Sequence, residues 1–430
     1  MLPKVAYILL WFPKPSETFI FHEVSQLGKM GLPLKVYSLY GELKRDLSAG
    51  MAAASEGVER LGMPSVAGLP LDVLYWWKRA PGAVKSLFAT VPARKWCDLE
   101  AAGENLWAFL CGFRLGRMAE RDSIRHLHAP WANGPATAAW VASRLTGIPF
   151  SFAAHAGDIF PQDGALKDKI RECAFVRTEN RANVSHLEKY ADGRGEKIHV
   201  VYNGIPVRHA VSSPPSFGRP LRMLALGRFV PKKGFDVLIR SCKILGGSGL
   251  DFRLTVGGSG RERKELDRLV RMFGLEGRVD FPGFILHQRV PDFLRSGDVF
   301  VMPSVIDASG DRDGIPTVIL EALLHRLPVV ASNVSGIGEI IRDGETGLLV
   351  PPGDASAVAR AVLRVAANRR QALEMAERGR LAVLEDFDVE RNCRTILGLL
   401  LEHVKPLQTR ASLYSSSLSP GVNRDESCRK

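Results

Sequence analysis

Two cations stand in one short loop of the C-terminal half, in the pairs Gly227-Arg228 and Lys233-Gly234. The loop follows a predicted strand over 221–226 and precedes a predicted helix. In open α/β sheets ligands bind at the carboxyl ends of the strands, so both side chains are expected to project into a cleft. Arginine can donate to two phosphate oxygens while lysine acts as a point charge, and together they suit a diphosphate. A solvated basic loop is the alternative interpretation.

A second motif, from Asp313 to Glu321, lies at the start of a predicted helix over 316–325. The first turn of a helix offers unpaired backbone N–H groups and a positive dipole end to an anion. The residues expected to bind the diphosphate at this helix start are Gly314, Ile315, Pro316 and Thr317. Glu321 lies one turn further on, where a carboxylate suits ribose hydroxyls, and Asp313 could accept hydrogen bonds from sugar hydroxyls. The alternative for Glu321 is a glutamate that the helix dipole favours.

Glycines of the same half indicate a nucleoside site. The loop 257–260 follows a predicted strand and resembles part of a dinucleotide fingerprint, but Arg263 stands where the third glycine belongs. A nicotinamide-dependent oxidoreductase is therefore kept as an alternative. Gly258 from this loop, with Gly283 and Phe284 after the next predicted strand, is expected to contact the nucleoside.

The triplet Asp311-Arg312-Asp313 also spells D-x-D, a known signature for a metal–diphosphate complex. We expect no metal here, because Asp313 belongs to the larger motif. Arg228 and Lys233 already supply the counter-charge that a metal would provide.

The N-terminal half contributes its own candidates. His155 follows a predicted strand over 149–153, so it is expected to face the same cleft, with a structural histidine as the alternative. Ser16, Glu17 and Thr18 follow the first predicted strand and open a helix. We expect Ser16 to be the N-cap of that helix, although backbone groups of the loop could also contact a ligand.

Short apolar runs alternate with amphipathic stretches along the chain, which is typical of parallel sheets covered by helices. The predicted strands are 4–10, 34–39, 124–128, 149–153, 174–178 and 197–201, then 221–226, 252–256, 278–281, 298–302, 327–331 and 347–350. Two such series predict an α/β fold of two doubly wound, Rossmann-like domains that face a cleft. The predicted parts are an N-terminal domain (1–210), a linker (211–220), a C-terminal domain (218–385), a helix (386–405) and a disordered tail (406–430).

The stretch 40–123 departs from the alternation and is predicted to be an insertion in the N-terminal domain. Its four tryptophans are Trp76, Trp77, Trp96 and Trp107, and basic residues such as Lys78 and Arg79 lie among them. Packing of the aromatic side chains on the N-terminal sheet is one interpretation, since most aromatic residues belong to cores. The other is an interfacial patch on an anionic membrane.

Composition limits the kind of protein. The 430 residues carry a formal net charge of +12, which suits anionic partners. No separate basic arm stands out, and we expect no nucleic-acid partner. The six cysteines form no CxxC pair or zinc-like cluster, which is typical of a reducing compartment. The apolar start is short and runs into Pro13 and Pro15, and no apolar run reaches the ~18 residues of a membrane span. A cytoplasmic protein is expected.

Together these motifs resemble glycosyltransferase family 4, whose members have the GT-B fold. The residues that carry the resemblance are Gly227-Arg228, Lys233-Gly234, Asp313-Gly314 with Pro316 and Glu321, Ala154-His155-Ala156, Tyr202-Asn203-Gly204 and the segment 343–353. The start Ser16-Glu17-Thr18-Phe19 resembles the bacterial exopolysaccharide and colanic-acid branch of that family. Only 40–123 and the tail fall outside the resemblance.

The resemblance implies a retaining transfer of a sugar from a UDP- or GDP-sugar, with no catalytic metal and no cofactor. Arg228 and Lys233 would hold the donor diphosphate and stabilise the leaving group. Glu321 would bind the ribose, Asp313 would contact donor-sugar hydroxyls, and His155 would lie beside the transferred sugar.

The chain departs from the family pattern at two places. Family members usually carry Glu where this chain has Asp313, which is one methylene shorter. Their Gly-Gly loop after the first strand is replaced here by Pro13–Thr18. These departures concern single contacts rather than the class of reaction.

Our hypothesis from the sequence is a glycosyltransferase that extends a glycan, or a polyprenyl-linked glycan, in bacterial surface or exopolysaccharide synthesis. The helix at 386–405 would cross back to the N-terminal domain, and the protein would lie in the cytoplasm, with peripheral contact to the inner face of the membrane. A non-catalytic sugar-nucleotide or membrane-binding scaffold is the alternative.

Overall fold

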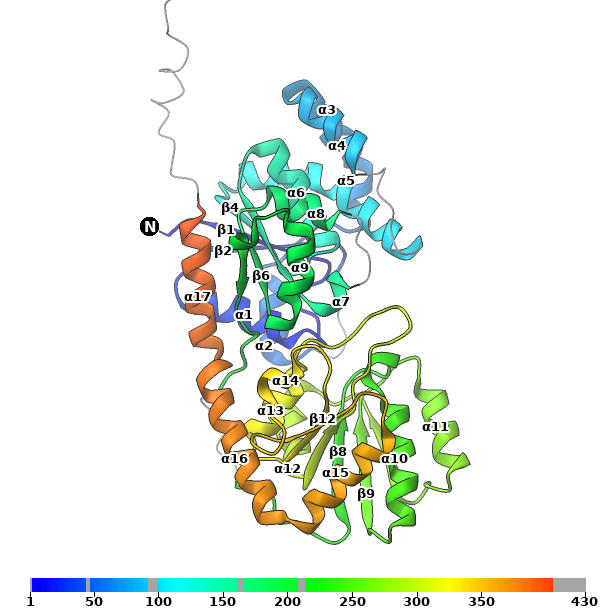
Figure 1. The fold of residues 1–430 in the computed structure, drawn as a ribbon. Helices are drawn as coiled ribbons and strands as arrows, with labels where there is room; N and C mark the ends of the chain where they lie inside the picture. Colours follow the sequence, from blue (N-terminus) through cyan, green and yellow to red (C-terminus); the bar gives the residue numbers. More distant parts are fainter. Residues whose placement is uncertain (1, 44–46, 92–98, 161–164, 208–212, 405–430) are drawn as a thin grey trace, which may run out of the picture.

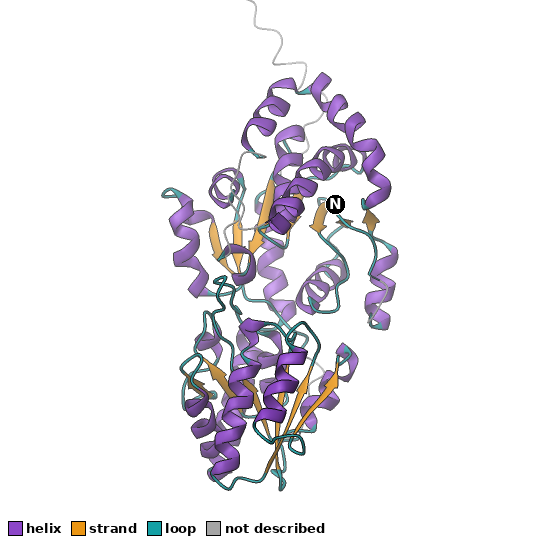
Figure 2. Cartoon of the chain, turned by 90° about the vertical axis from the view of Figure 1, so that its right-hand side faces the viewer, coloured by secondary structure: helices purple, strands orange, loops and turns teal. Residues whose placement is uncertain are grey.

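The computed structural model describes residues 2–43, 47–91, 99–160, 165–207 and 213–404. The predicted tail and Trp96 lie outside these residues. Two parallel sheets, each covered by helices on both faces, form two domains that face one another (Figures 1 and 2). The predicted fold class, two doubly wound Rossmann-like domains, is therefore confirmed.

The N-terminal sheet has seven strands in the order β3-β2-β1-β4-β5-β6-β7. The strands are β1 (Val5–Leu9), β2 (Leu34–Ser38), β3 (Glu59–Arg60), β4 (His126–Ala129), β5 (Phe150–Ala154), β6 (Val176–Thr178) and β7 (Ile198–Val200). The helices are α1 (Thr18–Lys29), α2 (Ala49–Glu56), α3 (Leu69–Arg79), α4 (Pro81–Thr90), α5 (Leu99–Arg121), α6 (Gly134–Thr146), α7 (Ala156–Ile159), α8 (Leu166–Glu172) and α9 (Val184–Ala191). The short edge strand β3 was not predicted, because two residues carry no recognisable periodicity.

The C-terminal sheet has six strands in the order β10-β9-β8-β11-β12-β13. The strands are β8 (Leu221–Leu226), β9 (Phe252–Gly257), β10 (Val279–Gly283), β11 (Val299–Met302), β12 (Val329–Ser332) and β13 (Leu348–Val350). The helices are α10 (Phe235–Gly247), α11 (Arg263–Met272), α12 (Val290–Arg295), α13 (Thr317–Leu324), α14 (Ile337–Ile340), α15 (Ala355–Ala367), α16 (Arg369–Asp386) and α17 (Val389–Glu402).

Strand alternation determines how each sheet is covered. In β1, Ala6 and Ile8 join the core beneath α5 and α6, whereas Val5, Tyr7 and Leu9 join the core on the opposite face. Successive side chains of a strand point to opposite faces, so a continuously apolar strand must be buried on both. This two-sided burial holds the sheets at the centre of each domain and leaves the strand ends to form the site.

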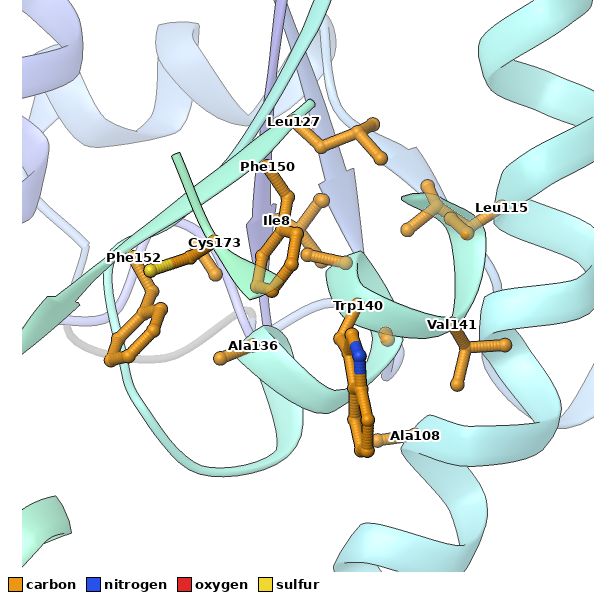
Figure 3. Close-up of a cluster of buried hydrophobic side chains, with 14 of the residues drawn as sticks. Ile8, Ala108, Leu115, Leu127, Ala136, Trp140, Val141, Phe150, Phe152 and Cys173 are labelled. Carbon is orange, nitrogen blue, oxygen red and sulfur yellow. The ribbon is translucent and has the colours of Figure 1, made fainter. Parts of the chain in front are cut away.

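The segment 40–123 is mainly helical and packs through α5 on α6. The close-up in Figure 3 shows Trp140 and Val141 of α6 beside Ala108 of α5. A Cβ atom at Gly112 of α5 would come within 2.5 Å of Val141, so glycine permits the close approach of the two helices.

Two of the tryptophans in this segment belong to the core. Trp76 is buried and donates from Nε1 to the Phe113 carbonyl (2.8 Å), and Trp107 donates to the Leu39 carbonyl (2.9 Å). Buried indoles normally find such a partner. The packing interpretation is therefore confirmed for Trp76 and Trp107, whereas Trp77 is exposed.

The chain crosses between the domains twice, and the two crossings touch. Ile205 pairs with Asp388 as an isolated parallel bridge, and a Cβ at Gly204 would lie 2.3 Å from the Val389 Cα. Helix α17 follows the second crossing and packs on α1 through Cys393, Ile396 and Leu400. The last described helix is thus part of the N-terminal core, and Figure 1 shows α17 running beside the N-terminal domain.

Glu339 of α14 ties the C-terminal domain to the N-terminal domain. One carboxylate oxygen accepts from the backbone N–H groups of Arg181 (2.8 Å) and Ala182 (3.2 Å), and the other accepts from the Tyr202 hydroxyl (2.8 Å). All three donors belong to the opposite domain. Charge-assisted hydrogen bonds of this kind are stronger than neutral ones, so Glu339 holds the cleft closed.

We predict that Glu339→Ala shifts the protein toward an open form. The lost bonds are partly exposed, so we expect a change of about 1 kcal/mol in the closing equilibrium, roughly fivefold in population. Small-angle X-ray scattering should show a larger radius of gyration. Glu345→Ala is the matched control, because Glu345 pairs with Arg342 of its own domain. Equal radii for the parent and the Glu339 variant would contradict this assignment.

Candidate active site

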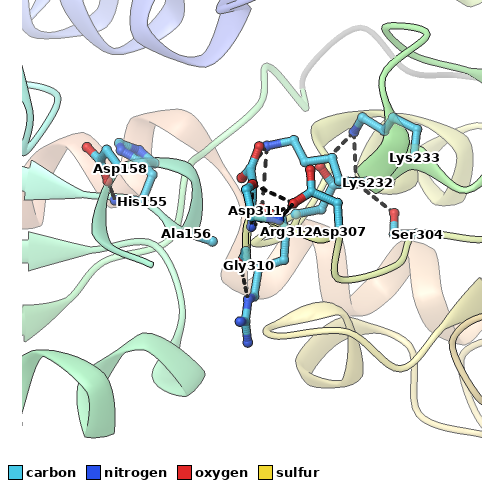
Figure 4. Close-up of polar contacts among 12 residues, drawn as sticks. His155, Ala156, Asp158, Lys232, Lys233, Ser304, Asp307, Gly310, Asp311 and Arg312 are labelled. Atoms are coloured by element: carbon cyan, nitrogen blue, oxygen red, sulfur yellow. Dashed lines mark hydrogen bonds and ion pairs between the residues drawn. The ribbon is translucent and has the colours of Figure 1, made fainter. Parts of the chain in front are cut away.

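A cavity of about 510 Å³ lies between the domains, at the carboxyl ends of strands from both sheets. The N-terminal domain contributes residues that follow β1, β4, β5 and β6, and the C-terminal domain contributes residues that follow β8, β9, β10 and β11. Because parallel strands end at the same edge of a sheet, each domain presents one row of loops to the cleft. Figure 4 shows His155 and Ala156 on one side, with Lys232, Lys233 and Asp311 on the other.

The cavity brings together nearly all of the residues singled out in the sequence. Those that line it are Ser16, Glu17, Thr18, His155, Arg228, Lys233, Gly258, Phe284, Asp313, Gly314, Ile315, Pro316, Thr317 and Glu321. Gly283 does not line it; its carbonyl instead accepts from the Gly258 N–H group (2.8 Å). Gly283 therefore supports the loop that carries Gly258.

A buried ion pair lies at the centre of the C-terminal wall. The Lys233 ammonium is 2.9 Å from both oxygens of Asp313, and the Ser304 hydroxyl donates to one of them (2.6 Å). Burial lowers the pKa of Lys233, although Asp313 acts in the opposite direction. Burial alone would raise the pKa of Asp313. The combined effect of Lys233, Lys232 and Ser304 is larger and in the opposite direction, so the pKa of Asp313 is lowered. The contacts of 2.9 Å between them favour the charged form of each group in the presence of the other.

Gly234 allows the lysine to reach this position. Its φ is +62°, in the left-handed region, and a Cβ atom there would lie 2.0 Å from the Pro303 carbonyl oxygen. Only glycine meets both requirements at little cost. Helix α10 begins at the next residue, so the turn fixes Lys233 beside the cleft and leaves Arg228 exposed in the cavity.

The glycines of the loop 257–260 also serve packing. A Cβ at Gly258 would lie 1.8 Å from the Gly227 carbonyl oxygen, and one at Gly260 would lie 2.5 Å from the Phe229 carbonyl oxygen. The loop thus packs on the turn that carries Arg228. This close contact accounts for the glycines without a bound dinucleotide. The loop therefore no longer supports the alternative of a nicotinamide-dependent oxidoreductase.

Both carboxylates of the D-x-D triplet already have a cationic partner. Asp311 accepts from the Lys232 ammonium (2.9 Å), as Asp313 does from Lys233. Within the described ranges no group of three or more His, Cys, Asp or Glu side chains is arranged to hold a metal. Between the two aspartates, the Arg312 guanidinium lies 3.8 Å from the ring centroid of Phe160 in the other domain.

Glu321 faces the cavity from the second turn of α13. Helix α13 begins at Thr317, with Pro316 at the N-cap position rather than inside the first turn. Burial raises the pKa of Glu321 to about 7. A carboxyl group held in this way favours a ligand that donates hydrogen bonds to it, such as a sugar hydroxyl.

His155 lies in an aromatic enclosure on the N-terminal side. Its ring centroid is 4.6 Å from that of Trp131 and 5.2 Å from that of Phe19. Burial, followed by the charge of Arg177, lowers the pKa of His155 to about 3, so the imidazole is neutral. Its backbone N–H group donates to Asp158 (2.7 Å) and opens α7.

Glu179 is a site residue that sequence reasoning missed. It follows β6, lines the cavity, and one of its oxygens lies 4.0 Å from the His155 Nε2 atom. The other oxygen accepts from the Asn180 amide (3.2 Å) and faces Gly314 of the opposite domain. Burial raises the pKa of Glu179 to about 7. The position of this glutamate after a strand is the signal that could have revealed it.

The N-terminal loop differs from expectation at Ser16. Helix α1 begins at Thr18 with Glu17 at the N-cap position and no side-chain cap, so the prediction that Ser16 is the N-cap was wrong. Glu17 accepts from Lys14 (2.6 Å) and from the Trp131 indole (3.2 Å) instead. These contacts order the loop against the wall that holds His155.

A larger cavity, of about 690 Å³, adjoins the first one and shares Glu321 with it. Its two arginines are each paired with an aspartate, Arg222 with Asp298 (2.6 Å) and Arg295 with Asp292 (2.9 Å). It does not contain the Lys233–Asp313 pair or His155. We therefore assign the site to the smaller cavity.

Two facing Rossmann-like domains with the site in the cleft between them define the GT-B class of glycosyltransferase. Solved structures of this class superpose over nearly the whole chain. A glycosyltransferase from Rickettsia africae gives a TM-score of 0.70 at 14% identity, covering 94% of this chain and 98% of that one. Anabaena Alr3699/HepE in complex with UDP gives 0.68 at 18% identity, covering 93% and 100%. At these identities the likeness concerns the fold.

Sequence comparison identifies the family. Residues 220–368 match the model of glycosyl transferases group 1. WcaL of Salmonella typhimurium, described as a colanic acid biosynthesis glycosyltransferase, is 34% identical over 414 residues, which cover 92% of this chain and 99% of WcaL. WcaL of Escherichia coli is 33% identical over 420 residues, with the same coverage. The chain belongs to the group 1 glycosyl transferases, and the family predicted from the sequence is confirmed.

We predict that Glu179→Gln stabilises the protein at pH 8 but not at pH 5. The pKa of Glu179 is raised from an ordinary value near 4.5 to about 7, so its contribution to stability is complete below pH 4.5 and is lost as the pH rises through 7. The neutral amide avoids that loss, and we expect a gain of ~1–3 kcal/mol at pH 8. Unfolding in urea at both pH values measures it.

Glu188→Gln is the control for this experiment, since Glu188 is an exposed glutamate of α9. It should change stability equally at pH 5 and pH 8. If the Glu179 variant also showed no difference in stability between the two pH values, the raised pKa that we assign to Glu179 would be contradicted.

Proposed function

We propose that the protein is a retaining, metal-independent glycosyltransferase that transfers a hexose from a UDP- or GDP-sugar to a glycan or polyprenyl-linked glycan. The observation that carries the proposal is the Lys233–Asp313 pair beside Arg228, in a cavity that His155 closes from the other domain. Two cations and a helix start favour a diphosphate, and a neutral imidazole with surrounding carboxyl groups favours a sugar.

The reaction would place developing negative charge next to these cations. As the bond between the anomeric carbon and the diphosphate oxygen breaks, the bonding electrons stay on the leaving diphosphate. Lys233, Arg228 and the N–H groups at the start of α13 would stabilise that charge. The acceptor hydroxyl forms the new bond to the anomeric carbon, and its proton passes to the departing phosphate. Because the cations balance the phosphate charge, no metal is required for this step.

The first role of Asp313 would be to position the Lys233 ammonium. Both of its oxygens are occupied by Lys233 and Ser304, so it holds the ammonium in place before a donor binds. A preorganised cation does not have to reorient as charge develops. Contact between Asp313 and sugar hydroxyls would then use the lone pairs that these bonds leave free.

The biological setting follows from the relatives. The two WcaL proteins are described as acting in colanic acid biosynthesis, and AmsK of Erwinia amylovora, 34% identical over 206 residues, in amylovoran biosynthesis. We infer a role in bacterial exopolysaccharide synthesis. The acceptor would be a growing glycan, lipid-linked at the inner face of the cytoplasmic membrane. Within the described residues, no helix combines the length and apolarity of a membrane span.

The first test is a donor screen with a site variant. We expect one of UDP-glucose, UDP-galactose, the UDP-N-acetylhexosamines or GDP-mannose to raise the unfolding temperature, because a bound donor stabilises the fold by mass action. Transfer or slow hydrolysis of that donor, followed by NMR, should release a product of retained anomeric configuration and persist in EDTA. Lys233→Ala should lower kcat by about 100- to 1,000-fold.

Lys264→Ala is the matched control, since Lys264 is exposed on α11 away from the cleft. It should leave both binding and turnover unchanged. A folded protein that binds and turns over none of these donors would refute the proposal. Binding without turnover, unaffected by Lys233→Ala, would favour the scaffold alternative.

A second prediction concerns the ribose. If Glu321 accepts hydrogen bonds from ribose hydroxyls, Glu321→Ala should weaken binding of the nucleoside diphosphate by about 10- to 100-fold. The parent should bind the 2′,3′-dideoxy analogue of the nucleoside diphosphate as weakly as the variant binds the nucleoside diphosphate itself. The variant should bind both ligands with equal affinity. Isothermal titration calorimetry measures all four affinities. Glu265→Ala, an exposed change on α11, is the control; a variant that still discriminates would place the ribose elsewhere.

A further inference from the structure

Large apolar side chains are exposed along the outermost helices of the N-terminal domain. They are Met63 and Val66 in the 3-10 helix 63–68, Leu71, Leu74 and Trp77 in α3, and Phe88 in α4. We name this set the outer helical surface. Figure 1 shows α3 and α4 at the end of the molecule farthest from the C-terminal domain. Such a concentration on one short segment differs from the scattered exposed apolar residues of ordinary surfaces.

Helix α3 carries apolar side chains on both faces: Leu69 and Trp76 are buried on the inward face, and large apolar residues are also exposed on the outward face. Leu71, Leu74 and Lys78 follow the i, i+3, i+7 spacing of a single helix face. Leu71 is 65% exposed and Leu74 is 48% exposed, whereas Asp72 is 2% exposed on the inward face. The inward carboxylate of Asp72 pairs with arginines of α5.

Those pairs hold α3 rigidly with Leu71 and Leu74 outward. Asp72 accepts from Arg114 (2.9 Å) and from Arg117 (2.6 Å), and Trp76 packs and donates to the Phe113 carbonyl beside them. A buried carboxylate with two partners fixes the rotation of the helix about its axis. The face that carries Leu71 and Leu74 therefore cannot turn inward to escape water.

The exposed charges within residues 63–91 all have one sign, although Arg79 pairs with Glu120 of α5 (2.9 Å). Between residues 63 and 91 the sequence contains one acid, the buried Asp72, and the exposed charged residues are Lys78, Arg79 and Lys85. The Lys85 ammonium lies 5.8 Å from the Trp77 ring centroid. An aromatic ring with a lysine beside it suits the boundary between lipid headgroups and acyl chains.

We propose that the outer helical surface docks the protein on an anionic lipid bilayer, with α3 lying along the headgroup region. Leu71, Leu74 and Trp77 enter the acyl boundary while Lys78 and Lys85 contact lipid phosphates. The docking itself stands on the exposed residues and their charge. Its use, to bring the acceptor-side domain to a lipid-linked acceptor, rests on the function proposed above.

Charge also argues against a second copy of this chain as the occupant. Two such surfaces placed face to face would bring Lys78 and Lys85 of both copies together without an exposed acid in 63–91 to balance them. Like charges at an interface suppress that pairing. An anionic bilayer satisfies both the apolar side chains and the lysines.

Flotation of the full chain with liposomes tests the proposal. We expect the parent to float with vesicles that contain phosphatidylglycerol, and to stay unbound with vesicles of phosphatidylcholine alone. Leu71→Glu with Leu74→Glu should lower the bound fraction at least tenfold, and Lys78→Glu with Lys85→Glu should abolish the preference for the anionic lipid. Met272→Glu, at a 53% exposed apolar residue of α11, is the control and should float like the parent.

Two further measurements make the result decisive. Donor binding by thermal shift should be the same in the parent and in the leucine variant, so a failed donor screen and a failed flotation remain separate outcomes. If the leucine variant unfolds, Met63→Gln with Phe88→Gln tests the same surface. A parent that does not float with anionic vesicles, or variants that float equally well, overturns the proposal. A dimer in sedimentation velocity that the leucine changes dissociate, without flotation, overturns it in favour of self-association.

Discussion

The ion pair between Lys233 and Asp313 is the interaction on which the C-terminal half of the site depends. A buried charge needs a partner and hydrogen bonds, and loss of one member of such a pair costs about 3–5 kcal/mol. Here the aspartate has the lysine and Ser304, and the lysine is delivered by a turn that only Gly234 can make. The loop after β8 and the loop before α13 are consequently fixed relative to one another. Arg228 lies in the first of these loops and Gly314 in the second.

The N-terminal half of the site is organised by burial rather than by charge pairing. His155 is neutral and enclosed by Trp131 and Phe19, and Glu179 is held near its ring without a strong cation of its own. Ionised groups are expensive in such surroundings. The two walls of the cleft therefore differ in character: the C-terminal wall centres on a buried ion pair, and the N-terminal wall centres on a neutral imidazole among aromatic rings. A polar ligand bound between them would experience both at once.

Much of this arrangement could be predicted from the residues alone. Alternating apolar strands and helices have a strong periodic signal, which is why both sheets were identified, whereas the family was identified from its motifs. The cation-bearing turn was identifiable because Arg228, Lys233 and Gly234 lie in one short loop of the sequence. Glu179 was missed because its role arises from Gly314, which is distant in sequence and is brought to it only by domain closure. The Ser16 cap was predicted wrongly because cap position depends on a single residue of helix register.

Helix α17 has a consequence for the order in which the molecule can be made. Its residues Cys393, Ile396 and Leu400 complete the core that covers one face of β1, the first strand to be synthesised. Domains generally fold as units during translation. This N-terminal domain must wait, with the Val5, Tyr7 and Leu9 face of β1 incompletely covered, until the whole C-terminal domain has emerged from the ribosome. The core of the N-terminal domain is thus completed only once α17 is available, and we expect the exposed face of β1 to need protection from aggregation until then.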